Sequence, residues 1–171
     1  MNMPPESASR REPHSLAGHQ IRDLPASTGW NVSKAGPMFT AIPVRNFEKL
    51  TKLPVEARAD DQRGDVLIHI ADASRPDLDF GRPYERRREH EGLQLYVSTN
   101  PDVRGDRLLL PQPYQGRIDC VAGALERGTP SCMLVVTSNG IRHTLTIAPD
   151  QIAHWRDFVD GYLRFMDELG A

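Results

Sequence analysis

The Asn139-Gly140 pair constrains the fold more than any other feature of this sequence. It separates two apolar-rich runs, SCMLVVTS (131–138) and IRHTLTIA (141–148). Asn-Gly between two such runs is the strongest short-range signal of a β-hairpin, because both residues accept the positive φ of a type I′ turn. The sequence therefore predicts a hairpin of two strands in this region.

His143 is the lone polar residue on one face of the second run. Alternation along a strand groups it with Ile141, Leu145 and Ile147. A face with three large aliphatic side chains is expected to turn toward the core. A buried imidazole needs a hydrogen-bond partner, so we expect His143 to find one inside the protein.

A long amphipathic helix is expected directly after the hairpin, from residue 149 to residue 169. Its apolar residues recur at intervals of three and four; they are Ile152, Trp155, Val159, Tyr162, Met166 and Leu169. Pro149 suits the first helical turn, and Gly170 suits a cap after the last one. The stripe predicts that Trp155 packs in the core.

Further short apolar segments indicate more strands upstream. They are PMFTAIPV (37–44), DVLIHIADA (65–73), GLQLYVST (92–99), RLLLP (107–111) and GRIDCVAGAL (116–125). NFEKLTKL (46–53) is expected to form a short helix capped by Asn46. Strands do not alternate with full helices, so a doubly wound parallel sheet is not expected. The pattern predicts an α+β fold: a mostly antiparallel curved sheet or barrel of about seven strands, packed by one long C-terminal helix.

The chain is expected to divide into an arm and one domain. Residues 1–35 are rich in proline, serine and small residues, which predicts a flexible N-terminal arm. Residues 36–171 are expected to form a single β-rich domain. The N-terminal sequence has no apolar signal-peptide region, so we expect a cytoplasmic location, with export without a conventional signal peptide as the alternative.

The sequence contains no recognisable catalytic or cofactor-binding motif. This favours a protein that is not an enzyme and that binds no cofactor. The spacing of Cys120 and Cys132 fits no zinc motif. We expect both cysteines to be small buried residues, with a disulfide between neighbouring strands as the alternative. No metal site is expected; His69 and His143, both on predicted strands, are the candidates if one exists.

The segment from Ser74 to Glu91 is the most charged part of the chain. It holds five arginines and five acidic residues, so it is neutral as a whole and is expected to be a solvated loop. Three of its arginines, Arg86, Arg87 and Arg88, could still point together at the phosphates of a nucleic acid. The candidate binding residues are Tyr84, Arg86, Arg87, Arg88 and Tyr96.

These observations predict a non-enzymatic binding protein whose partner is another macromolecule. A protein partner is preferred because the formal net charge is −2, whereas chains that bind nucleic acid through phosphates are usually basic. The predicted function is a protein–protein interaction or regulatory module, with a homodimer as an open alternative. The second function left open is binding of single-stranded nucleic acid by the five candidate residues.

The C-terminal run from Ser131 to Met166 resembles the end of a Whirly-type single-stranded-DNA-binding domain, in which a hairpin also leads into an amphipathic helix. That resemblance implies curved antiparallel sheets that bind a single strand. The overall pattern is also similar to a pleckstrin-homology-like domain, with about seven strands and a closing helix that bears Trp155. This second resemblance implies binding of a peptide or a phosphoinositide.

Overall fold

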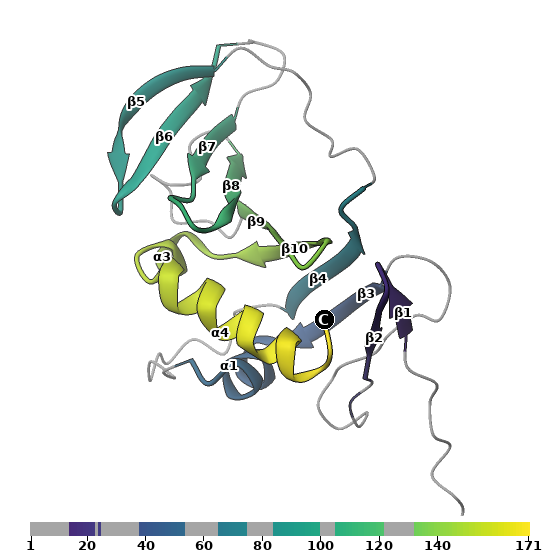
Figure 1. Cartoon of the computed structure of the whole chain (residues 1–171). Coiled ribbons are helices and arrows are strands. Elements are labelled where there is room, and N and C mark those ends of the chain that lie inside the picture. Colours follow the sequence, from purple (N-terminus) through teal and green to yellow (C-terminus); the bar gives the residue numbers. More distant parts are fainter. Residues whose placement is uncertain are drawn as a thin grey trace, which may run out of the picture.

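The computed structural model describes residues 14–22, 24, 38–53, 65–74, 84–99, 105–121 and 132–171. An eight-stranded antiparallel sheet, a small two-stranded sheet and two main helices make up this part of the chain (Figure 1). The small sheet pairs β1 (His14–Leu16) with β2 (His19–Ile21). The strands of the large sheet are β3 (Met38–Pro43), β4 (Asp65–Asp72), β5 (Tyr84–His90), β6 (Leu93–Ser98), β7 (Gly105–Leu109), β8 (Gln115–Val121), β9 (Cys132–Ser138) and β10 (Ile141–Ile147).

The order across the large sheet is β3-β4-β10-β9-β8-β7-β6-β5. Strands β5 to β10 follow one another as a meander that starts at one edge and runs back toward β4. The last strand, β10, therefore lies between β4 and β9. Since β3 and β5 are the two edges and do not pair, the sheet is open, which corrects the barrel alternative.

The α+β class, the antiparallel sheet and the C-terminal helical packing are confirmed. The predicted hairpin is present, with φ of 53° at Asn139 and 76° at Gly140. The large sheet has one strand more than expected, because β5 lies within the segment predicted as a charged loop. Its side chains are mostly exposed, so no apolar alternation marked it as a strand; pairing with β6 holds it in the sheet.

The expected helix over 149–169 is split in two. A single turn, α3 (Pro149–Ile152), is followed by α4 (Trp155–Glu168). The break falls at His154, whose φ of −116° and ψ of 30° depart from helical values. The apolar stripe nevertheless continues across the break, because both pieces bury their apolar residues against the same sheet.

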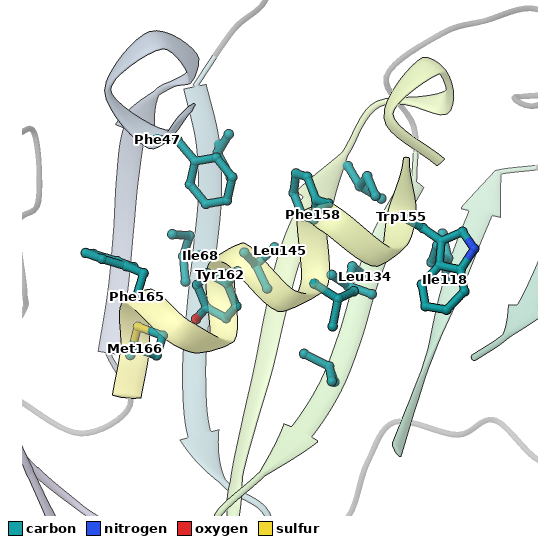
Figure 2. Close-up of a cluster of buried hydrophobic side chains, with 14 of the residues drawn as sticks. Phe47, Ile68, Ile118, Leu134, Leu145, Trp155, Phe158, Tyr162, Phe165 and Met166 are labelled. Carbon is teal, nitrogen blue, oxygen red and sulfur yellow. The ribbon is translucent and has the colours of Figure 1, made fainter. Parts of the chain in front are cut away.

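The core lies between α4 and the sheet. Figure 2 shows Trp155, Phe158 and Tyr162 on the helix facing strands that carry Ile118, Leu134, Leu145 and Ile68. All seven side chains are at most 6% exposed. Trp155 is thus a packing residue, as its place in the apolar stripe predicts.

The short helix α1 (Val44–Thr51) closes one side of this core. Its Phe47 ring lies 5.3 Å from Phe158 and 6.3 Å from Tyr162 between ring centroids. At Gly161 a Cβ atom would come within 2.8 Å of the Thr51 carbonyl oxygen, so glycine permits the close approach of α1 and α4. The helix begins after Pro43, which precedes it as the cap residue, so the expected cap at Asn46 is wrong.

Part of the predicted N-terminal arm belongs to the folded core. The β1–β2 hairpin lies beside the C-terminal end of the chain (Figure 1), where the Arg22 N–H donates to the Leu169 carbonyl at 2.8 Å. Ile21 is only 1% exposed and joins the main apolar cluster. The expectation of a flexible arm therefore does not hold for residues 14–22; the rest of the 1–35 segment, apart from Leu24, lies outside the described residues.

Cys120 and Cys132 form a disulfide. The expectation of two free buried thiols is therefore wrong, and the alternative of a bond between neighbouring strands is correct. The two residues face each other directly in the register of β8 and β9. Sequence alone could not show this, because it depends on how β8 and β9 align. The disulfide joins two neighbouring strands in the middle of the sheet, on the side that α4 covers.

Candidate functional site

The two faces of the large sheet differ sharply. One face is covered by α1 and α4, and we call it the helix-covered face. No helix of the described residues covers the other face, and we call it the helix-free face. The large apolar side chains that are exposed in the described part of the chain are Leu67, Leu109, Val121 and Met133, at 37–57% exposure. Each alternates with a buried neighbour on its strand, so all four lie on the helix-free face.

A row of directly paired residues crosses five strands on the helix-free face. It runs from β5 to β9, and we call it the central ladder. The register pairs Arg86 with Tyr96, Tyr96 with Arg107, Arg107 with Asp119, and Asp119 with Met133. Cross-strand partners on one face lie within reach of each other, so the ladder is a continuous strip of side chains.

Arg107 is the best-anchored member of the central ladder. Its Nε donates to Asp119 Oδ1 at 2.8 Å, and its guanidinium carbon lies 4.6 Å from the centroid of the Tyr84 ring. Arg117 donates from Nε to the other oxygen of Asp119, also at 2.8 Å. Burial is the largest single influence and lowers the pKa of Arg107, but the hydrogen bond to Asp119 and the charge interactions with Asp119 and Tyr84 together outweigh it, so the net shift is upward. Two arginines thus share one carboxylate, and the first of them holds Tyr84 in place.

The five candidate residues from the sequence do not all come together. Tyr84, Arg86 and Tyr96 lie on the helix-free face, with Tyr84 against Arg107. Arg87 instead forms an ion pair with Glu85 at 3.1 Å. Glu85 alternates with Tyr84 and Arg86, so this pair points to the opposite side. Arg88 lies in the irregular stretch of β5 between Arg86 and Glu89 and has no place in the register.

His69 and His143 lie on adjacent strands but on opposite faces. The register pairs His69 with Thr144 and His143 with Ile70, so one ring is exposed and the other is 2% exposed. The two histidines therefore cannot bind one metal ion together. No group of three or more potential metal ligands occurs among the described residues.

His143 has the hydrogen-bond partner that its buried position requires, and this partner is Tyr162. Nδ1 of the imidazole lies 2.7 Å from the Tyr162 hydroxyl, and the two rings meet edge to face at 5.2 Å. Burial lowers the pKa of His143 to about 4, and it raises the pKa of Tyr162 well above its ordinary value. Both groups are neutral at physiological pH, which suits a structural polar pair inside the core.

Arg107, Asp119 and Met133 were not among the candidate residues. Each belongs to a short segment whose letters carry no motif, and only the alignment of β7, β8 and β9 brings them into one row. The alternation in GRIDCVAGAL (116–125) is the one signal that could have placed Asp119 opposite the core residues. The site therefore depends on strand register, which no single segment encodes.

None of the helices in the described residues has the length and apolar character needed to span a bilayer. No protein-family model matches the chain, and no curated protein matches it by sequence. A solved structure does resemble it: Smlt3025, an immunity protein of the Stenotrophomonas maltophilia type IV secretion system, with a TM-score of 0.63 and 12% sequence identity. The alignment covers 94% of each chain, so the two proteins share the whole fold.

Proposed function

We propose that this chain is a non-enzymatic binding protein that acts by holding another protein, as an immunity protein holds the toxin that it neutralises. The observation that carries the proposal is the helix-free face, which combines tyrosine, arginine and exposed aliphatic side chains. Aromatic residues, methionine and arginine are the types enriched where proteins bind proteins. The shared fold with an immunity protein supports the same role.

The balance of charge on the helix-free face favours a protein over a nucleic acid. Strand register places on it Arg86, Arg107, Arg117 and Arg142, and also Asp65, Glu89 and Asp119. Four arginines against three carboxylates leave little net positive charge. A surface that binds single strands needs a basic groove along the phosphates, so the nucleic-acid alternative has less support.

A co-expression assay tests this function. The probes are the proteins encoded by the genes on either side of this chain's gene, each expressed in a host cell alone and then together with this chain. We expect one of them to arrest growth alone, and this chain to relieve the arrest and to co-elute with it at a fixed ratio in size-exclusion chromatography. Relief without a complex would point instead to an enzyme that modifies the toxin or its target. No relief and no complex with either neighbour would contradict the proposal.

We also propose that the protein is exported without a conventional signal peptide. Disulfides persist mainly in oxidising compartments, so the Cys120–Cys132 bond favours the exported alternative over the cytoplasm. Quenching native cells in acid and then alkylating the denatured protein with a maleimide mass tag tests this, because unfolding exposes cysteines that are buried in the fold. We expect no tag on either cysteine without prior reduction; full tagging would place the chain in a reducing compartment.

A further inference from the structure

We propose that the central ladder is the docking surface, and that its occupant is a protein surface with a carboxylate opposite Arg86 and apolar side chains opposite Met133 and Leu109. This inference rests on the proposed function, because it assumes that the partner is a protein. It adds the location of the contact and the chemistry of the partner, which the fold likeness does not supply.

The apolar part of the argument comes from where exposed side chains gather. Met133 ends the central ladder, and Leu109 pairs with Gln94 and Arg117 in the next row of the same face. These side chains are 37% and 41% exposed, although they lie in the middle of the sheet and not in loops. Aliphatic groups left in water beside tyrosine and arginine are typical of a surface that a partner covers.

The Tyr84 ring, which lies beside the central ladder, is already held in the free protein. Arg107 is held between the Tyr84 ring and Asp119, and the Arg117 side chain holds the other oxygen of that carboxylate. Tyr96 lies between Arg86 and Arg107 in the register. Side chains held in their bound arrangement lose little freedom on association, so Tyr84 is suited to act as an anchor. Tyr96 offers a second aromatic side chain on the same face.

The expected charge of the partner depends on the arginine that is most accessible to it. Arg107 and Arg117 already share Asp119, whereas Arg86 is exposed on the edge strand β5. A guanidinium there can bind a carboxylate in a bidentate way. Glu89, which pairs with Gln94 in the next row, limits the positive charge to the Arg86 end. One carboxylate opposite Arg86 therefore fits better than an extended acidic surface.

Site-specific photo-crosslinking in native cells tests the location. The probe is benzoylphenylalanine placed at Leu109 or Met133 on the helix-free face, and at Asp157 or Asp167 on the exposed side of α4 as controls. We expect one discrete protein adduct from the first two positions and none from the controls. Equal adducts from both sets, an adduct removed by nuclease, or an adduct of twice the chain mass would overturn the proposal. So would the lack of any adduct at Leu109 and Met133.

Variants of neighbouring residues test the chemistry, using the partner found in the co-expression assay. Arg86→Glu and Arg87→Glu make the same charge change on adjacent residues that point to opposite sides. We expect Arg86→Glu and Tyr96→Ala each to raise the dissociation constant about tenfold or more, and Arg87→Glu to change it less than about twofold. Thermal melting checks that each variant is folded.

The outcomes separate the two proposals. If the partner binds and Arg86→Glu, Tyr96→Ala and Met133→Asp all leave the dissociation constant within twofold of the parent, the docking surface is wrong and the proposed function stands. If no neighbouring gene product binds and no protein adduct forms, both are wrong. Equal weakening by Arg86→Glu and Arg87→Glu would show a general effect of charge and overturn the assignment to Arg86.

Discussion

The helix-covered and helix-free faces belong to the same strands, and adjacent residues serve one or the other. On β9, Leu134 is fully buried beneath α4, whereas Met133 is 37% exposed on the other side. On β8, Ile118 is buried and Asp119 joins two arginines. One face therefore holds the fold together, and the other is left free to carry contacts. Mutations in neighbouring residues should separate these two roles.

The largest contrast is expected between Leu134→Ala and Met133→Ala. Leu134→Ala leaves a cavity under α4 and should lower the free energy of unfolding by about 2–5 kcal/mol. Met133→Ala removes a side chain that is already partly in water, so we expect a loss of about 0.5 kcal/mol. Urea denaturation of both variants measures the difference. Equal losses would show that the helix-free face is also structural.

The disulfide should contribute nearly as much as one core residue. Replacing both Cys120 and Cys132 with alanine removes a cross-link between two residues that are 12 positions apart in the sequence. Loop-closure entropy predicts a loss of about 3 kcal/mol in the free energy of unfolding. Urea denaturation of the double variant, beside the oxidised and the reduced parent, measures it. If reduction of the parent changes nothing, the bond does not support the sheet.

The buried histidine should make the helix-covered face sensitive to acid. The folded-state pKa of His143 is about 4, below the ordinary value of 6.5. Its contribution to stability is therefore complete above pH 6.5 and is lost as the pH falls from 6.5 toward 4, up to about 3 kcal/mol. Unfolding free energies at pH 7.5 and 4.5 measure the loss.

Matched histidine variants isolate this effect from other titrating groups. His143→Gln should flatten the dependence on pH over this range, although it is itself less stable. His69→Gln, on the helix-free face, is the matched control for the loss of a histidine. The same pH profile in the parent and His143→Gln would mean that another group is responsible.

A small stability effect is also expected for Asp119 in the central ladder. Asp119→Asn keeps the size of the side chain but weakens its bonds to Arg107 and Arg117. Because all three groups are partly exposed, we expect a loss of about 1 kcal/mol or less in the free energy of unfolding. The more informative readout is partner binding, which should weaken more than stability does. A large stability loss would place Asp119 with the structural residues.

Local pattern predicted much of this fold. The turn at Asn139-Gly140, the core position of His143 and the apolar stripe that carries Trp155 all follow from spacing within one segment. The errors concern residues whose role depends on distant segments. β5 is a strand because it pairs with β6, Ile21 is buried because the C-terminal end of the chain covers it, and the cysteines bond because β8 and β9 align.

The candidate site shows the same limit more strongly. Tyr84, Arg86 and Tyr96 stood out by residue type and do share a face, whereas Arg87 turns away to Glu85. Arg107, Asp119 and Met133 could not be singled out, because their grouping comes from the register of three separate strands. Residue types thus suggest which side chains can bind, and register decides which ones can bind together.

The position of β10 has a consequence for how the chain folds. This strand pairs with β9 through a tight turn but also with β4, about 75 residues earlier in the sequence. Until β10 docks, β4 and β9 both present unpaired edges, and the two halves of the sheet are separate units. Long-range pairing of this kind is slow, so we expect the joining of β10 to β4 to limit the folding rate. During synthesis on the ribosome, the large sheet can be completed only after Ile147, the last residue of β10, has emerged.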